Sequence, residues 1–234
     1  MLYPEQSVAA NPNRCWNWFL PEHQRRDAGE PAAILSLVNE IVGRHPIDRT
    51  RIYVVGLSAG GALAAILAEV APDVFAAAGI MAGVALHAAH DVPSAFAAMR
   101  GDAARPNAKP VVAARAENGD DPYRRLRVSI WTGARDRLVA PANAARLLAQ
   151  FSEAIGLAPE GGVAERRGQS EIVRFSDPSG RVRLEMCSID EMGHAWSGGS
   201  FRGSHTWPKG PRATDEFMAF FLETDLVEAT FATR

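Results

Sequence analysis

The strongest structural constraint in this chain is a short run of β-branched residues that leads directly into a serine flanked by glycines. Residues 51–55 form the run, and residues 56–61 read Gly-Leu-Ser-Ala-Gly-Gly. Because the run does not alternate between polar and apolar residues, it predicts a strand buried on both faces of a parallel sheet. Residues 62–70 predict a helix directly after it. A strand, a tight turn and a helix in this order place the serine at the carboxyl edge of a sheet.

The rest of the chain repeats this alternation of strand and helix. Further strands are predicted at residues 74–81, 128–131, 172–175 and 182–189, and further helices at residues 30–44, from 141 onward and at about 214–222. The turn sequence Asp-Pro-Ser-Gly at 177–180 predicts a hairpin before the last strand. We therefore expect one α/β domain over residues 1–234, with a mostly parallel sheet covered by helices on both faces. Residues 87–127 show no clear period and are interpreted as an excursion or partial lid.

Charge and hydrophobicity restrict the partners of such a domain. The chain carries 25 basic and 27 acidic residues, a formal net charge of −2, which gives no electrostatic reason to expect nucleic acid or an anionic membrane surface. The longest apolar stretch, residues 74–86, is shorter than the roughly 18 residues of a membrane-spanning helix. We expect a small or neutral ligand, no nucleic acid and no membrane.

Ser58 has the sequence context of an activated nucleophile. A serine hydroxyl is a weak nucleophile at neutral pH, so it must be held beside a base on an exposed, strained turn. Gly56, Ser58 and Gly60 match the G-x-S-x-G pattern of such a turn. An ordinary glycine-rich loop is the alternative, but the strand before and the helix after favour the nucleophile. The N–H of Ala59, at the start of that helix, is the expected oxyanion donor.

The base and the acid should follow the serine along the chain, with the acid first. His194 comes just after the last predicted strand, whereas His205 lies in a polar loop and is better explained as a surface histidine. Asp136 follows a predicted strand and is the first candidate for the acid, although it could also be a turn aspartate that caps the next helix. Asp190 also ends a strand and remains its rival.

Other polar and aromatic clusters give weaker signals. His87, His90 and Asp91 have a spacing that could gather a metal, but no further ligand set is evident and a solvated face explains them better, so we predict no metal.

The tryptophans fall in loops or beside the candidate base. Substrate binding and ordinary packing explain them equally well. The substrate-binding candidates are Trp16, Trp18 and Trp196.

Four segments of the chain resemble the poly(3-hydroxybutyrate) depolymerase-like esterases, which are related to feruloyl and acetyl-xylan esterases. They are Leu-Tyr-Pro-Glu-Gln at 2–6, Cys-Trp-Asn-Trp-Phe at 15–19, the serine motif at 56–61, and Gly-His-Ala-Trp-Ser-Gly-Gly at 193–199. The second and fourth are the most specific. The resemblance implies an α/β-hydrolase fold and a cofactor-free serine esterase that acts through an acyl-enzyme. Its substrates would be short-chain or hydroxyalkanoate esters, small or polymeric, or alternatively feruloyl or acetyl-xylan esters.

The resemblance also implies strands and a His-Gly-Cys turn upstream of residues 2–6. In the family this turn supplies a second oxyanion N–H and a plausible disulfide partner for Cys15. Nothing precedes Met1 in this sequence, so we expect a truncated N-terminus, a free Cys15 thiol and a slow esterase or weakly active pseudoenzyme. We also expect a strand at residues 2–3 to be left as an open edge through which copies could associate.

Overall fold

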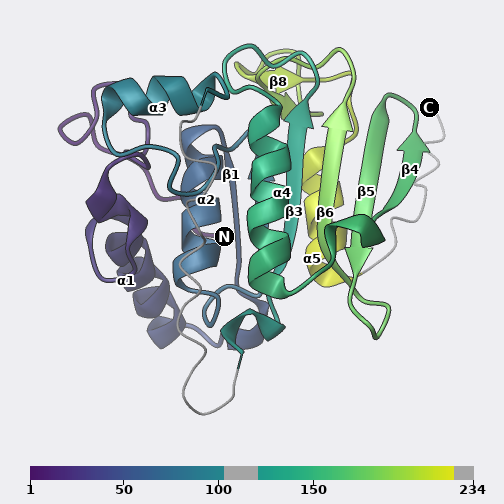
Figure 1. Cartoon of the computed structure of the whole chain (residues 1–234). Helices are drawn as coiled ribbons and strands as arrows, with labels where there is room; N and C mark the ends of the chain where they lie inside the picture. Colours follow the sequence, from purple (N-terminus) through teal and green to yellow (C-terminus); the bar gives the residue numbers. More distant parts are fainter. Residues whose placement is uncertain (103–120, 224–234) are drawn as a thin grey trace, which may run out of the picture.

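The computed structural model describes residues 1–102 and 121–223, which are organised around a six-stranded sheet (Figure 1). The strands are β1 (Tyr53–Leu57), β2 (Ala77–Met81), β3 (Arg127–Gly133), β4 (Val163–Arg167), β5 (Ser170–Ser176) and β6 (Val182–Ile189). Their order is β1-β2-β3-β6-β5-β4. Strands β1, β2, β3 and β6 are mutually parallel, whereas β5 is antiparallel to β6 and β4 is antiparallel to β5. The predicted mostly parallel sheet and the β5–β6 hairpin are confirmed.

Helices cover both faces of this sheet, as predicted. They are α1 (Gly29–Arg44), α2 (Ala59–Val70), α3 (Val92–Met99), α4 (Ala142–Ile155) and α5 (Ala213–Leu222). Helices α2 and α4 pack on one face, and α5 lies behind the sheet in Figure 1. Within the described residues, none of these helices is both long and apolar enough to cross a membrane.

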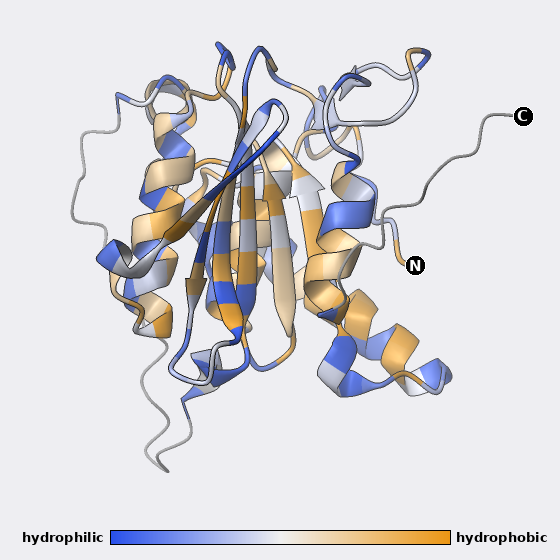
Figure 2. Cartoon of the chain, turned by 90° about the vertical axis from the view of Figure 1, so that its right-hand side faces the viewer, coloured by the Kyte–Doolittle hydropathy of each residue, from blue (hydrophilic) through white to orange (hydrophobic). Residues whose placement is uncertain are grey.

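The sheet separates two apolar layers of the core, and a third apolar cluster joins α1 to α2. Because successive side chains of a strand point to opposite faces, Ile80 joins the layer under α2 and α4, whereas Met81 joins the layer under α5. In Figure 2 hydrophobic colours run through the middle of the sheet, and the helices alternate between hydrophobic and hydrophilic residues. The carboxyl ends of the four parallel strands meet at one edge, beside the short pair β7 (Trp196–Ser197) and β8 (Thr206–Trp207).

Two expectations about exposed strands were wrong. Strand β1 is not buried on both faces, since none of its residues is fully buried and Val55 is 49% exposed. In the described part of the chain it pairs only with β2, so it is an edge strand. Residues 2–3 form no strand. One open edge of the sheet therefore belongs to β1, and β4 forms the other edge. Burial of a strand depends on its neighbours as well as on its own sequence.

The region interpreted as a lid contains regular structure. Helix α3 begins at a capping box, in which Asp91 accepts the Ser94 N–H and the Ser94 hydroxyl accepts the Asp91 N–H. Residues 103–120 of the same region lie outside the described residues. The sequence reading also missed β4, whose residues are all exposed and carry no hydrophobic alternation.

Candidate active site

The turn at Ser58 has the strained geometry expected of an exposed nucleophile. Ser58 has φ 58° and ψ −120°, a conformation that residues other than glycine rarely adopt, and its N–H donates to the Met81 carbonyl at 2.9 Å. A side chain at position 56 would overlap the Gly60 carbonyl, and one at position 61 would come within 2.7 Å of the Met81 oxygen. The small residues are thus required because backbone approaches backbone on both sides of Ser58.

Helix α2 starts directly after this serine. As its first residue, Ala59 has no intrahelical acceptor for its N–H. The N-terminus of a helix also favours negative charge. The Ala59 N–H is therefore available to an oxyanion that forms on a group bonded to Ser58.

The structure brings the candidate base and the candidate acid into direct contact. His194 Nδ1 lies 2.7 Å from Asp136 Oδ2, and the Asp136 side chain is 0% exposed. An ionised carboxylate can only accept, so Nδ1 carries a proton, and Nε2 is the nitrogen that has a lone pair in the neutral ring. Asp136 Oδ1 accepts the N–H groups of Leu138 and Val139, each at 2.9 Å. Asp136 is thus both a turn aspartate and the partner of the histidine, two readings that the sequence presented as alternatives.

Backbone contacts fix the approach of these two loops. After β3, the Ala134 N–H donates to the Ile189 carbonyl at 2.8 Å and the Arg135 N–H donates to the Met192 carbonyl at 3.0 Å. Gly133 permits this close approach, since a side chain there would overlap the Met192 carbonyl. Backbone hydrogen bonds therefore hold the loop after β3 against the loop after β6, independently of the Asp136 and His194 side chains.

The rival residues lie elsewhere. Asp190 forms an ion pair with Arg166, and its side chain is 39% exposed. His205 is exposed, and its carbonyl accepts the Trp196 N–H at 2.7 Å. Among the described residues, neither side chain forms a hydrogen bond or ion pair with His194.

Ser58 is placed at the same carboxyl edge of the sheet, but in the described part of the chain it forms no hydrogen bond with the pair. Among residues 1–102 and 121–223, its hydroxyl makes no hydrogen bond. The structure thus joins Asp136 to His194 directly and places Ser58 after a strand parallel to those that carry them. A base with a free nitrogen, a half-buried serine hydroxyl and a helix N–H at one edge can support nucleophilic acyl transfer.

The three tryptophan candidates occupy different environments. Trp16 is half-buried, and its Cδ1 lies 3.9 Å from where a Cβ would stand on Gly60. Trp196 donates its Nε1–H to the Thr214 hydroxyl at 3.2 Å. Trp18 is only 7% exposed and belongs to the core layer under α2, so packing is its role in this structure.

The described residues contain no group of three or more histidine, cysteine, aspartate or glutamate side chains suited to a metal ion. The His87 ring bonds Gln24 and Glu69 instead. Cys15 is exposed and free, whereas Cys187 is free but buried, and burial strongly raises the pKa of its thiol.

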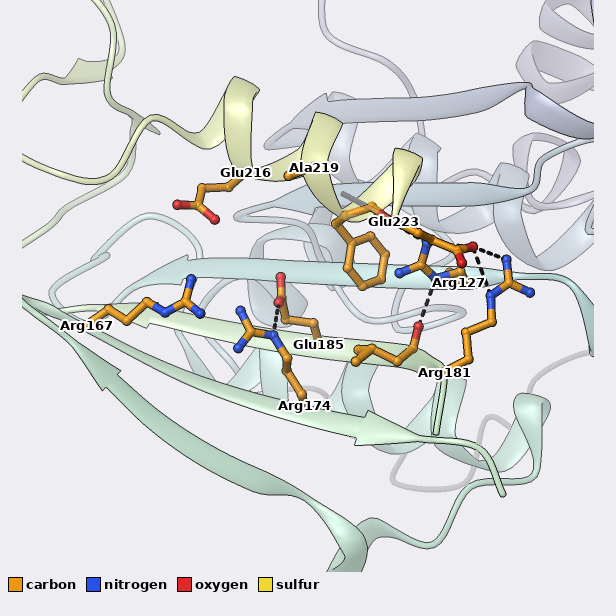
Figure 3. A pocket seen from close by; sticks show the side chains of 10 residues that line it. Arg127, Arg167, Arg174, Arg181, Glu185, Glu216, Ala219 and Glu223 are labelled. Carbon is orange, nitrogen blue, oxygen red and sulfur yellow. Dashed lines mark hydrogen bonds and ion pairs between the residues drawn. The ribbon is translucent and has the colours of Figure 1, made fainter. Parts of the chain in front are cut away.

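A polar pocket of about 550 Å³ lies between α5 and the sheet, apart from these residues (Figure 3). It is lined by Arg127, Arg167, Arg174, Arg181, Val182, Glu185, Glu216, Ala219, Phe220 and Glu223. Most of its charges pair within the pocket, such as Arg174 with Glu185 at 2.8 Å. Glu216 makes no ion pair with the described residues, and burial together with the nearby Glu185 raises its pKa. The pocket is thus a largely self-neutralised network.

Comparison with known proteins identifies the family. Residues 1–173 match the family described as Esterase PHB depolymerase. The chain belongs to this family. This chain is 34% identical over 204 residues to poly(3-hydroxyalkanoate) depolymerase C of Paucimonas lemoignei. The match covers 83% of this chain and 47% of that protein.

More distant relatives extend the similarity to other esterases. Feruloyl esterase B of Thermothelomyces thermophilus is 29% identical over 163 residues, covering 67% of this chain and 55% of that protein. The chain spans about half the length of these curated relatives. An acetyl xylan esterase from Aspergillus awamori has a TM-score of 0.68 at 19% identity, covering 89% of this chain and 73% of that structure. This likeness confirms the α/β-hydrolase fold.

Proposed function

We propose that this chain is a serine ester hydrolase that acts through an acyl-enzyme. Ser58 Oγ attacks the ester carbonyl while its proton passes to His194 Nε2, and Asp136 holds the ring in the tautomer that can accept it. The Ala59 N–H stabilises the oxyanion. His194 then returns the proton to the leaving alcohol. A water molecule, deprotonated by the same nitrogen, hydrolyses the acyl-enzyme and restores the Ser58 hydroxyl.

One observation carries this proposal. The 2.7 Å contact between His194 Nδ1 and the buried Asp136 carboxylate leaves Nε2 as the free nitrogen, at the sheet edge where the strained turn presents Ser58. A histidine with a buried carboxylate partner and a nearby serine on a strand-to-helix turn is the arrangement that acyl transfer needs.

Hydroxyalkanoate and other short-chain esters are the proposed substrates. The family match and the relative named as a poly(3-hydroxyalkanoate) depolymerase support this choice. The similarity to feruloyl esterase B supports cell-wall esters as the second candidate, which the same residues would serve. A slow enzyme is expected in either case if Ala59 supplies the sole oxyanion donor, because one missing donor costs about 10² to 10³ in rate.

The test is turnover of a panel of esters by the parent chain and by Ser58→Ala. The panel contains p-nitrophenyl butyrate, hydroxybutyrate oligomers and methyl ferulate. Saturable hydrolysis that Ser58→Ala abolishes and Ser36→Ala, at an exposed site on α1, leaves unchanged would support the proposal. Preference for methyl ferulate would select the second candidate. Absence of turnover on every ester, or parent-like turnover by Ser58→Ala, would overturn the proposal.

A further inference from the structure

The segment that carries Trp16 has almost no regular secondary structure of its own. Between residues 10 and 24 the sole regular element is a short 3₁₀ helix, Pro21–Gln24. Nevertheless Trp16 packs beside Gly60, two residues after the candidate nucleophile. Something outside the segment must therefore hold it in place, because an irregular segment is otherwise free to move.

The buried carboxylate of Glu30 holds this segment at its tryptophan end. Its oxygens accept the Asn17 N–H, each at 2.9 Å, and Oε1 also accepts from Asn17 Nδ2 at 3.0 Å and from Gln6 Nε2 at 2.6 Å. Asn17 in turn donates to the Ala10 carbonyl at 3.3 Å and accepts from Asn11 Nδ2 at 2.9 Å. One carboxylate thus organises the residues on both sides of Trp16.

N–H donors, and no cation, balance this buried charge among the described residues. The nearest basic group is His23, but its Nδ1 accepts the Glu30 N–H at 2.8 Å and therefore carries no proton. Glu30 lies in the first turn of α1, where the helix N-terminus favours negative charge. Burying an ionised carboxylate is costly unless its hydrogen bonds are satisfied, so the Asn17 and Gln6 donors are integral to the arrangement.

A separate cluster holds the other end of the segment. Gln24 Nε2 donates to the Phe19 and Ala89 carbonyls, which leaves Gln24 Oε1 to accept from His87 Nδ1 at 3.0 Å. His87 Nε2 faces both Glu69 oxygens at 2.9 Å. Both ring nitrogens thus face acceptors, which favours the protonated ring, and the Glu69 hydrogen bond raises the pKa of His87. None of these hydrogen bonds involves the Glu30 side chain, so we expect this end of the segment to stay in place when Glu30 is substituted.

We propose that Glu30 is a positioning residue, whose buried carboxylate holds Asn17 so that the indole of Trp16 forms a fixed wall beside the Ser58 turn. The inference rests on the ester hydrolase function proposed above. Because Glu30 would act on substrate only through Trp16, its loss should weaken substrate binding and leave the chemical step unchanged. That outcome is a rise in KM with little change in kcat.

The experiment is a double-mutant cycle of Glu30→Gln with Trp16→Ala, measured on p-nitrophenyl butyrate. We expect Glu30→Gln to raise KM about tenfold, which corresponds to about 1.4 kcal/mol of lost binding, with kcat within about twofold of the parent. In the Trp16→Ala background the Glu30 substitution should cause no further rise, because the positioned side chain is already gone. Glu30→Asp should recover part of the effect, and Glu40→Gln, at an exposed site on the same helix, is the matched control.

Hydrogen exchange keeps the test independent of turnover. Glu30→Gln should accelerate amide exchange in a peptide spanning residues 10–18 relative to Glu40→Gln. Its thermal midpoint should stay above the assay temperature, so that the chain is folded during the measurement. Unchanged exchange in that peptide would overturn the proposal, as would additive effects in the cycle or lowered stability with unchanged KM. A parent chain that hydrolyses no ester would overturn the proposed function instead. Accelerated exchange would then still support Glu30 as the anchor of the segment.

Discussion

Replacing Asp136 by asparagine alters one hydrogen-bonding atom in the candidate site. Asparagine keeps an oxygen that can accept the Leu138 and Val139 N–H groups, but it sets an N–H₂ group against His194 Nδ1. The ring must then place its proton on Nε2 to keep a bond at Nδ1, and that tautomer cannot take the Ser58 proton.

The expected loss is large. The wrong tautomer lowers kcat by about 10⁴ in the best-studied triad, which is about 5 kcal/mol of transition-state stabilisation at 1.36 kcal/mol per tenfold change. A mismatched buried hydrogen bond lowers the free energy of unfolding by about 1–3 kcal/mol, so the variant should remain folded at 25 °C.

The assay is kcat on p-nitrophenyl butyrate at pH 7, with circular dichroism to confirm folding. Asp190→Asn is the control, since its exposed ion pair with Arg166 contributes at most about 1 kcal/mol to stability. Its kcat should match the parent. A larger loss for Asp190→Asn would transfer the acid role to Asp190. If Asp136→Asn kept the kcat of the parent, the contact between Asp136 and His194 would have a structural role and no role in turnover.

Three further outcomes follow from the electrostatics and the exposed edge. Glu216→Gln should raise the thermal midpoint at pH 7, because a carboxyl whose pKa is raised by folding destabilises the native state once it is ionised. The gain should vanish below about pH 4, where the carboxyl is protonated in both the folded and the unfolded chain. An equal gain at both pH values would contradict this reasoning. A thiol reagent should modify Cys15 in the folded chain and Cys187 only after denaturant is added; rapid modification of both would show that the core layer under α5 is open. We propose that copies associate through the open edge of β1, so Val55→Lys should shift the sedimentation coefficient toward that of a monomer, and a parent chain that is monomeric at the same concentration would exclude this interface.

Strongly periodic segments were predictable from the sequence. Strand β6 has the predicted bounds, and α1 and α5 each begin one residue before the predicted start. The apolar residues of each segment recur at the spacing that places them on its buried face, so the local pattern and the tertiary packing agree. Strand β4 could not be found this way, because an exposed edge strand needs no apolar alternation.

The candidate site was predictable in part. The serine motif at 56–61 and the motif around His194 identify two residues by type and order, and the structure places both at the carboxyl edge of the sheet. The sequence left Asp136 and Asp190 as rivals, since both follow strands. Their difference arises from the backbone bonds that join the loop after β3 to the loop after β6, and such contacts between distant segments leave no local pattern.

Covalent labelling of the nucleophile offers the sharpest measurement on this chain. A fluorophosphonate should phosphonylate the folded chain at Ser58, located by mass spectrometry of the peptide that contains residues 56–61, and hydrolysis of p-nitrophenyl butyrate should fall in proportion to the labelled fraction. Asp136→Asn should label far more slowly, since its histidine lacks the free nitrogen. An adduct on another residue, or full hydrolysis by fully labelled chain, would contradict the assignment of Ser58 as the nucleophile.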